Sequence, residues 1–314
     1  MLHMRHPRDR AGDRQGHCSV CGSETRFVRN RWVLPAELAR TWHEGYVDRE
    51  SLLCATCGSS SRVRGVADAL VGLYGAGATS MAELVEEERF RSLDVLELNA
   101  IGRMHPVLAR LPKLTYAEYP EEDVTALSYT DSTFDLVLTS DTLEHVEDPM
   151  RGLREIHRVL RPGGRHVFTV PIDPELDTSR SRAGRPAEFH GRGGGPFSLV
   201  TRKADMLAHT DFGADLPDWL GLSGFGCQVY GSGIDSVFVA TARLTMTAAA
   251  QQLADEGRAS PDLLKRLQAD FETGRVGVVP SVEHGDDGDE VGLPDPLTEL
   301  AQPDVVHVDP ARKR

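Results

Sequence analysis

The chain has 314 residues, of which 40% are hydrophobic and 26% charged, and its formal net charge is −13. This length accommodates one large α/β domain and a small second module, because domains cluster near roughly 100 to 200 residues. No apolar run reaches the roughly 18 residues that cross a bilayer, and the first residues lack the apolar stretch of a signal peptide, so we expect a soluble, cytoplasmic protein without membrane insertion.

Charge is distributed unevenly along the chain. Residues 1–64 carry eleven arginines and no lysine against seven acidic residues, whereas residues 281–314 carry nine acidic and three basic residues. The body between them is strongly acidic and would repel phosphate backbones, which argues against a nucleic acid as the main partner. Residues 1–15 and 280–314 lack a hydrophobic period, so both segments are predicted to be disordered, the second as an acidic tail.

Four of the five cysteines form two CxxC pairs. The sequence CSVCGS at 18–23 recurs as CATCGS at 54–59. Two residues between paired cysteines let both thiolates face one tetrahedral ion, and a cytoplasmic compartment keeps thiols reduced. Residues 16–61 are therefore predicted to form a zinc ribbon with a structural Zn(II), closed to other ligands and remote from any cofactor. The expected metal ligands are Cys18, Cys21, Cys54 and Cys57.

Helices and then alternating strands and helices follow the ribbon. Val63, Val66 and Leu70 recur at helical spacing in residues 62–91, which we expect to form connecting helices. From 92 to 243, short apolar runs alternate with helical stretches, the pattern of a parallel sheet with helices on both faces. The predicted strands are Leu93–Leu98, Leu114–Tyr119, Phe134–Thr139 and Arg165–Val170.

Two further features reduce the number of α/β folds that fit the sequence. A helix with an apolar face from Met150 to Leu160 is expected to end at Pro162-Gly163-Gly164. Gly226–Tyr230 and Ser236–Thr241 flank a Gly-Ser-Gly turn and predict an antiparallel hairpin that closes the sheet. Residues 244–279 are expected to form two surface helices.

The segment after the strand at 93–98 has the features of a cofactor site. Open α/β sheets bind ligands at the carboxyl ends of their strands, and Glu97 stands there, followed by Asn99 and Gly102. A carboxylate can accept from an ammonium group, and a flexible turn lets the backbone approach a cofactor closely. Asn tolerates positive φ better than most residues, whereas Ile101 is bulky for such a turn.

The next segments fall in the order and spacing of a known family. Glu118 ends the strand at 114–119, Asp123-Val124 follows in a loop, and Asp131–Ser140 leads into Leu143–Pro149 and Leu153–Gly164. This succession resembles the class I methyltransferases that use S-adenosylmethionine (SAM). The resemblance implies a Rossmann-like α/β sheet with a C-terminal antiparallel hairpin over residues 92–243, in addition to the small N-terminal zinc ribbon.

The resemblance also implies roles for individual residues. Glu118 would accept from both ribose hydroxyls, and the acid Asp123 with the Val124 backbone amide would read the adenine. Ser140 would contact the cofactor through its backbone or a water, or cap the following turn. The family's usual turn has an acid and then three alternating glycines; here Asn99, Ile101 and Arg103 replace them and Gly102 is displaced.

Two histidines could remove a proton from a methyl acceptor, because their pKa lies near neutrality. His145 follows the strand at 134–139; alternatively it braces a helix start. Glu188-Phe189-His190-Gly191 resembles a branch of the family that also carries a cysteine ribbon and is often associated with sugar or glycan metabolism, which implies a lid and acceptor wall at 171–215. His190 could also be an ordinary loop histidine, and Arg62 could bind an acidic group or be solvated.

Three functions fit these features. The first is transfer of a methyl group from SAM to O or N of a small molecule or saccharide. The second is a binding module that has lost catalytic turnover, and the altered glycine turn is the main support for this alternative. The third is methylation of RNA or protein with the basic ribbon as docking element. Neither the acceptor nor the oligomeric state follows from the sequence.

Overall fold

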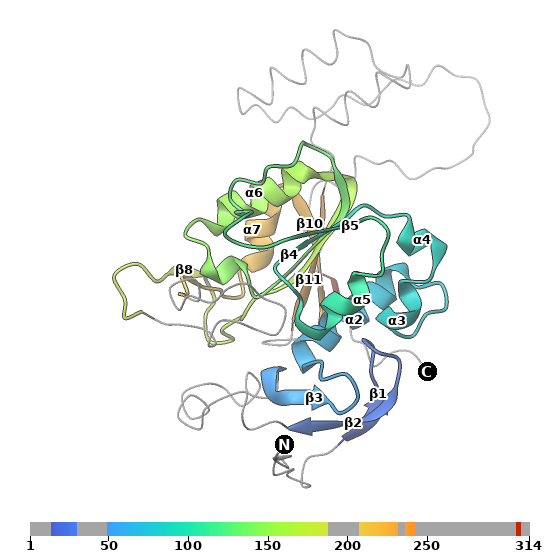
Figure 1. Ribbon diagram of the computed structural model, residues 1–314. Coiled ribbons are helices and arrows are strands. Elements are labelled where there is room, and N and C mark those ends of the chain that lie inside the picture. Colours follow the sequence, from blue (N-terminus) through green and yellow to red (C-terminus); the bar gives the residue numbers. More distant parts are fainter. Residues whose placement is uncertain (1–13, 30–48, 188–206, 232–235, 243–305, 309–314) are drawn as a thin grey trace, which may run out of the picture. The chain divides into compact units, whose positions relative to one another are not determined.

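A computed structural model describes residues 14–29, 49–187, 207–231, 236–242 and 306–308 (Figure 1). The first sheet is small and antiparallel, with strand order β1-β2-β3. Its strands are β1 (Arg14–His17), β2 (Glu24–Arg29) and β3 (Leu52–Cys54). Two short strands, β8 (Arg180–Ser181) and β9 (Thr210–Asp211), form a separate antiparallel pair.

The main sheet has seven strands in the order β12-β10-β11-β7-β6-β4-β5. The four strands from β5 to β7 run parallel, whereas β11 is antiparallel to both β7 and β10. The Rossmann-like sheet with a C-terminal antiparallel hairpin is therefore confirmed. Its strands are β4 (Val95–Leu98), β5 (Leu114–Ala117), β6 (Phe134–Ser140), β7 (Leu160–Thr169), β10 (Phe225–Tyr230), β11 (Val237–Ala242) and β12 (Val306–Val308).

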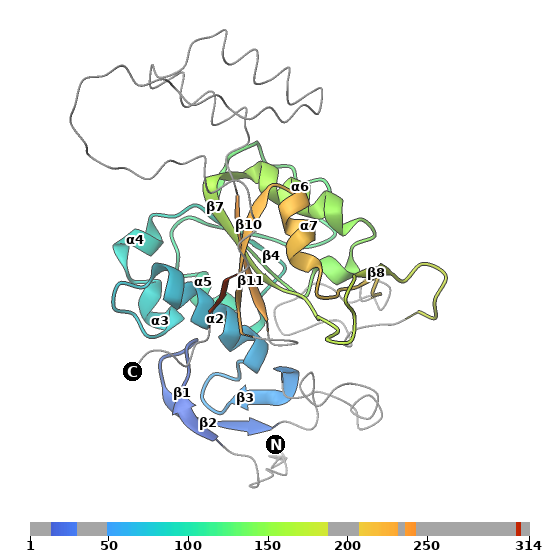
Figure 2. The ribbon, with the colours of Figure 1, turned by 180° about the vertical axis from the view of Figure 1, so that it is seen from behind.

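Helices cover both faces of this sheet, as Figures 1 and 2 show. One core packs side chains of α2–α5 against the sheet, and a second core packs α6 and α7 against the opposite face. Strands β4 and β6 are largely buried because both of their faces are covered. The helices are α2 (Ser61–Tyr74), α3 (Met81–Leu84), α4 (Glu88–Arg91), α5 (His105–Leu108), α6 (Pro149–Val159) and α7 (Leu216–Leu222), with 3₁₀ turns η3 (Gly102–Met104) and η4 (Leu143–His145).

Side-chain caps begin the two longest helices. The Ser60 hydroxyl accepts from the Val63 amide at the start of α2, and the Asp148 carboxylate accepts from the Arg151 amide at the start of α6. One expected boundary is wrong: α6 ends at Val159, and β7 already begins at Leu160. The Pro-Gly-Gly sequence is therefore part of β7, and the register of β7 against β6 shifts at this point.

Several expectations about the ends of the chain also change. Arg14 and Gln15 belong to β1, and residues 306–308 pair in parallel with β10, so neither expected disordered segment lacks structure throughout. The surface helices expected at 244–279 lie outside the described residues. Within the described part of the chain, no helix is both long and apolar enough to cross a membrane.

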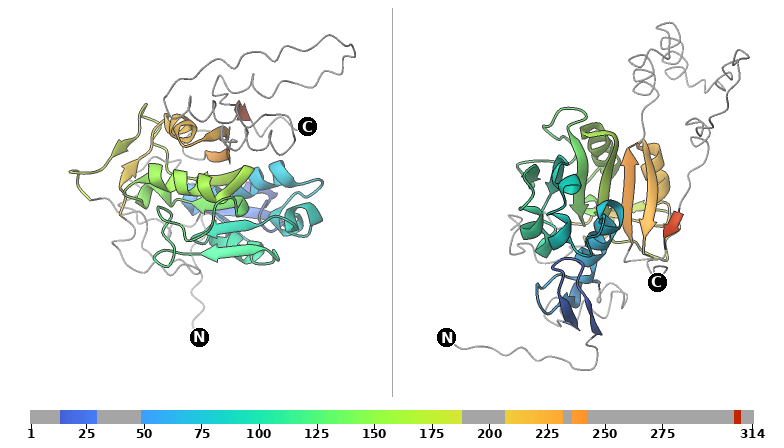
Figure 3. Two further views of the ribbon diagram at one scale, coloured as in Figure 1. Left: turned by 90° about the horizontal axis from the view of Figure 1, so that it is seen from above. Right: turned by 90° about the vertical axis from the view of Figure 1, so that its right-hand side faces the viewer.

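The small sheet is packed onto the α2–α3 side of the main domain (Figure 3). The Met81 and Ala82 amides of α3 donate to the carbonyls of Ser19 and Val20, at 2.7 and 3.1 Å. The Ser19 hydroxyl donates to the Arg64 carbonyl at 3.1 Å. The first cysteine knuckle is thus bonded to two helices of the main domain and shares its core.

A buried histidine lies in the middle of the main sheet. His166 of β7 is fully buried, stacks on Phe168 with ring centroids 4.3 Å apart, and places Nε2 3.0 Å from the Thr139 hydroxyl. Burial lowers its pKa to about 3. The imidazole is therefore neutral in the folded protein at pH values where the unfolded chain already binds a proton.

This pKa shift predicts a loss of stability in acid. The unfolded chain binds more protons than the folded one between pH 6.5 and about 3, so this contribution is complete above pH 6.5 and falls as the pH drops, by up to about 1.4 kcal/mol per pH unit. Replacement by phenylalanine, His166→Phe, should flatten the pH dependence. Urea unfolding of both proteins between pH 7 and pH 4.5 measures the difference, because the other titrating groups are common to both. Parallel curves would contradict the assignment.

Candidate functional site

The turn after β4 is organised by Glu97, whose side chain is fully buried. Its Oε1 accepts from the Ile101 amide at 2.9 Å, and its Oε2 lies 2.7 Å from His105 Nδ1. This bond to Glu97 raises the pKa of His105. The carboxylate therefore holds the turn and the start of α5 in place, a structural task that we did not expect from the sequence.

The altered glycine turn is formed by two residues in the left-handed region. Asn99 has a φ of +60° and Gly102 a φ of +47°. Asn99 thus takes up the positive φ for which its residue type was noted. The bulky Ile101 does not obstruct the turn, because its side chain is fully buried in the core beside α2.

Asn99 also connects the carboxyl ends of three strands. Its amide donates to the Ala117 carbonyl at 2.8 Å, and its Oδ1 accepts from the Tyr119 amide at 3.1 Å. Its Nδ2 lies 3.5 Å from the Thr142 hydroxyl beyond β6. The ends of β4, β5 and β6 therefore meet around one side chain.

Glu118 lies directly after β5 and is 4% exposed. Partial desolvation of the Tyr116 hydroxyl and its hydrogen bond to Glu118 raise the pKa of this hydroxyl, and the Glu97 charge adds to the effect. The rings of His105 and Tyr116 lie with centroids 4.5 Å apart. The structure therefore brings the two predicted acids, Glu97 and Glu118, to one site lined by a histidine and a tyrosine.

Asp123 and Val124 lie in the loop that precedes β6. Asp123 Oδ1 accepts from the Thr125 amide and hydroxyl, both at 2.8 Å, so the carboxylate stabilises its own turn. Val124 is buried against α6, where a Cβ on Gly152 would stand 3.4 Å from its Cγ1. These contacts hold the loop and leave the proposed adenine contact untested.

Ser140 ends β6 within a polar network. Its hydroxyl accepts from Arg62 Nη1 at 2.5 Å and lies 2.8 Å from the Thr169 hydroxyl. The next residue, Asp141, has a φ of +49°. Its carboxylate accepts hydrogen bonds from both terminal nitrogens of Arg49, each at 2.6 Å. Arg62 is thus neither solvated nor an open anion site, since its Nε also lies 3.3 Å from Asp141 Oδ2.

Sequence reasoning missed Arg49 and Asp141. Glu50 completes their network by accepting from Arg49 at 2.8 Å and from Arg62 at 2.7 Å. Burial raises the pKa of Asp141, but Arg49 and Arg62 outweigh burial and hold it well below its usual range. No hydrophobic period or motif contains these residues, so the sequence carried no signal for their pairing.

His145 lies in η4 and is largely buried, with 13% of its side chain exposed. Its Nδ1 is 3.0 Å from the Leu207 carbonyl, and its Nε2 is 3.7 Å from Glu144 Oε1. The Glu144 carbonyl accepts from the His209 amide at 2.7 Å. The segment before β9 is therefore docked on η4, whereas His190, the other candidate base, lies outside the described residues.

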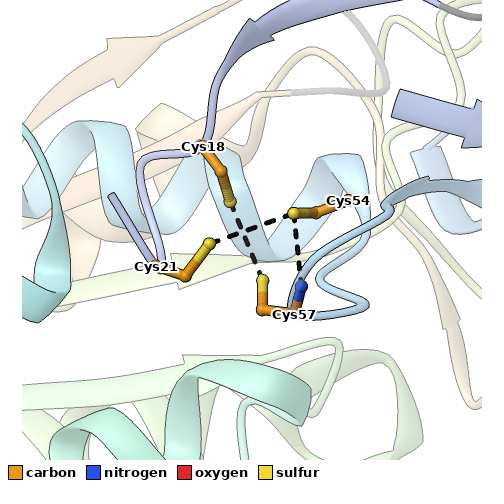
Figure 4. A group of neighbouring side chains, drawn as sticks. All are labelled: Cys18, Cys21, Cys54 and Cys57. Atoms are coloured by element: carbon orange, nitrogen blue, oxygen red, sulfur yellow. Dashed lines mark hydrogen bonds between the residues drawn. The ribbon is translucent and has the colours of Figure 1, made fainter. Parts of the chain in front are cut away.

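The four cysteines of the two knuckles converge (Figure 4). All four sulfur atoms lie within 4.8 Å of one another, with 3.8 Å between Cys18 and Cys57 and 4.0 Å between Cys21 and Cys54. Zn–S bonds of about 2.3 Å in a tetrahedron place sulfur atoms about 3.8 Å apart. The spacing is therefore close to that of a tetrahedral metal site.

The knuckle turns have the geometry expected of their glycines. Gly22 and Gly58 have φ values of +75° and +78°. The Cys57 amide points at Cys54 Sγ over 3.4 Å, and the Ser59 hydroxyl lies 3.5 and 3.2 Å from the sulfur atoms of Cys18 and Cys57. Hydrogen-bond donors of this kind stabilise charged metal thiolates.

The knuckles are not remote from the cofactor turn, in contrast to our expectation. A Cβ on Gly58 would stand 3.4 Å from Arg103 Nε, and a Cβ on Gly102 would stand 3.4 Å from Val63 Cγ2. The second knuckle and the start of α2 therefore pack against the turn that follows Asn99.

Comparisons with known proteins show which families this chain is similar to. Residues 74–168 match the family model described as a methyltransferase domain. The ubiquinone/menaquinone biosynthesis C-methyltransferase of Enterobacter sp. (strain 638) is 44% identical over 95 residues, covering 29% of this chain and 33% of that protein. An uncharacterized 37.1 kDa protein in a Streptomyces fradiae transposon is 39% identical over 79 residues, 23% of each chain.

The chain thus spans a third or less of the length of these two curated relatives. Among solved structures, the 1,6-didemethyltoxoflavin-N1-methyltransferase of Burkholderia thailandensis superposes with a TM-score of 0.35 and 17% identity. The superposition covers 70% of this chain and 96% of that one.

The left-handed turn yields a prediction for Gly102. A side chain at a φ of +47° is strained, so Gly102→Ala should destabilise the protein by about 1 to 2 kcal/mol. Gly72 is the matched control because it lies inside α2 with no neighbouring atom within 4 Å of an added Cβ. Gly72→Ala should instead stabilise by about 0.5 to 1 kcal/mol. Chemical unfolding of both variants measures the effects, and a neutral Gly102→Ala would argue against the turn as described.

Proposed function

We propose that this chain, which carries a class I methyltransferase domain, transfers a methyl group from SAM to O or N of a small-molecule or saccharide acceptor. The observation that carries the proposal is the meeting of Glu97, Asn99 and Glu118 at the carboxyl ends of β4 and β5. Open α/β sheets bind ligands at this edge. SAM supplies an electrophilic methyl group when it is bound.

The residues at this edge fit the groups that SAM presents. Glu118 is a nearly buried carboxylate bonded by Tyr116, and a carboxylate has acceptor capacity for several donors, ribose hydroxyls among them. Glu97 would balance the charge of the ammonium group while it holds the turn. The left-handed residues Asn99 and Gly102 allow close approach to the backbone. Asp123 and Val124 remain the proposed adenine contact, and Ser140 a contact through its backbone.

Removal of a proton from the acceptor is assigned to a histidine. At His145, a bond from Nδ1 to the Leu207 carbonyl fixes the tautomer, so that Nε2 is the nitrogen that can accept a proton. The neighbouring Glu144, 1% exposed, would stabilise the resulting imidazolium. His190 is the second proposed base and would enter from the segment between β8 and β9.

Two alternatives remain distinguishable by experiment. The likeness to a quinone-pathway C-methyltransferase favours transfer to carbon as a second candidate reaction. The inactive binding module loses its main argument, because the altered turn is formed with Asn99 at positive φ. Methylation of an acceptor panel with isotopically labelled SAM, followed by analysis of the methylated atom, separates O, N and C transfer.

A structural Zn(II) held by the four cysteines is the second part of the proposal. We expect one zinc per chain in freshly purified, reduced protein, because the sulfur spacing fits a tetrahedral site. Cys54→Ser should lower both the zinc content and the stability, since metal binding contributes to folding. Cys227→Ser is the matched control because Cys227 lies apart from the cluster. Elemental analysis after dialysis provides the test; protein without zinc would refute the assignment.

The cofactor site is tested by an isosteric change, Glu118→Gln. Loss of charge-assisted bonds should weaken binding of S-adenosylhomocysteine by about 1.5 to 3 kcal/mol, or roughly 10- to 150-fold. Glu122→Gln is the control, since Glu122 bonds Ser128 in the same loop. Isothermal titration measures both affinities. Equal affinities for wild type and Glu118→Gln would remove Glu118 from the site, and a wild type that does not bind would contradict the proposed function.

A further inference from the structure

Two arginines extend from the second cysteine knuckle to the carboxyl end of β6. Arg49 precedes Cys54 by five residues, and Arg62 follows Cys57 by five. Both contact Asp141, Arg49 through two bonds of 2.6 Å and Arg62 at 3.3 Å. The metal ligands of the second knuckle are therefore flanked on both sides by residues that hold the main domain.

The Arg49–Asp141 pair has the properties of a geometric constraint. Arg49 is 1% exposed, and a bidentate pair of a guanidinium with a carboxylate fixes both the distance and the orientation of the partners. Asp141 has a φ of +49°, a conformation that non-glycine residues adopt where their surroundings impose it. Thr169 also helps to hold Asp141 in this conformation, because its hydroxyl donates to Asp141 Oδ1 at 2.9 Å.

The charges of this network point to positioning rather than to ligand binding. Arg49 and Arg62 are balanced by Asp141 and Glu50, and Glu50 bonds both arginines. An anionic acceptor would have to displace a carboxylate that is already paired. The network is therefore suited to hold a backbone segment.

That segment leads directly to the proposed cofactor site. Asp141 is followed by Thr142, whose hydroxyl lies 3.5 Å from Asn99 Nδ2. Asn99 accepts from the Tyr119 amide, next to Glu118. On the other side, the Gly58 turn packs against Arg103, which directly follows the left-handed Gly102. The second knuckle is thus connected to the turn after β4 in two ways. One is the series of bonds through Asp141, Thr142 and Asn99, and the other is the contact of Gly58 with Arg103.

We propose that Arg49 is a positioning residue which, through Asp141, holds the strand-end turn of β6 against Asn99, so that the zinc ribbon forms part of the SAM site. Metal binding at the cysteines and SAM binding at the sheet edge then strengthen each other, because each requires the same placement of the second knuckle. The inference rests on the proposed function, since it presupposes that SAM binds at this edge. By linkage, the coupling must be equal in both directions.

The experiment measures binding of S-adenosylhomocysteine by isothermal titration to zinc-loaded and zinc-depleted full-length protein. We expect zinc depletion to weaken binding about tenfold or more. Asp141→Asn keeps a residue suited to positive φ but removes the charge, and in the zinc-loaded state it should weaken binding to a similar degree. Depleting zinc from Asp141→Asn should then weaken binding less than it does in wild type, because only the contact of Gly58 with Arg103 still connects the ribbon to the turn. Arg49→Lys, which keeps one charge without the bidentate geometry, should lie between wild type and Asp141→Asn.

Arg161→Gln is the matched control, because it breaks ion pairs to Asp94 and Asp135 at the amino ends of β4 and β6, away from the ribbon and from Asn99. It should leave both the affinity and its dependence on zinc unchanged. Chelator competition supplies the reciprocal measurement: S-adenosylhomocysteine should slow zinc loss more from wild type than from Asp141→Asn.

The outcomes separate the two proposals. Failure of zinc-loaded wild type to bind S-adenosylhomocysteine overturns the proposed function and, with it, this inference. If wild type binds equally well with and without zinc, or if Asp141→Asn binds like wild type, the ribbon acts apart from the cofactor site and the inference alone is overturned. Should the zinc-depleted protein unfold, the zinc-loaded Asp141→Asn and Arg49→Lys variants still decide the question.

Discussion

The contacts of Asn99 are the constraint on which the candidate site depends. Parallel strands place their carboxyl ends at one edge of a sheet, but the loops that leave those ends need something to hold them in a common arrangement. Asn99 does so with its backbone amide, its side-chain carbonyl and its side-chain amide, which reach β5, Tyr119 and Thr142. A left-handed asparagine combines these three contacts in one residue, whereas glycine at the same position would keep only the turn and the backbone bond to Ala117.

The parts of the fold that follow from local pattern were predicted well. Strands β4 and β6 consist largely of buried residues because both faces of the sheet are covered, and α2 repeats its buried residues at helical spacing. The duplicated CxxCGS knuckle likewise indicated a four-cysteine cluster. The hydrophobic pattern did not predict the boundary between α6 and β7. The strand begins at Leu160, where its register against β6 is irregular.

The polar contacts of the site could not be predicted from local sequence patterns. Glu97 and Asn99 stood out from their place after a strand, yet the bond from Glu97 to His105 and the pairing of Arg49 with Asp141 join residues whose positions in the sequence carry no period. Residues 92 positions apart meet because the ribbon packs on α2 and α3, and that packing depends on tertiary contacts such as the bonds of Ser19 and Val20 to α3. The assumption of a remote metal site failed for this reason.

The location of the ribbon also bears on how the acidic body can hold a cofactor. The Glu97 and Glu118 carboxylates both act on His105 and Tyr116, and a bound ammonium group would add a positive charge beside these two acids. The arginines of the second knuckle do not neutralise these acids, because Asp141 and Glu50 already balance them. Under the proposed function, the ribbon would therefore contribute geometry while the sheet edge keeps its negative charge, and a ligand that carries a cation would complement this edge.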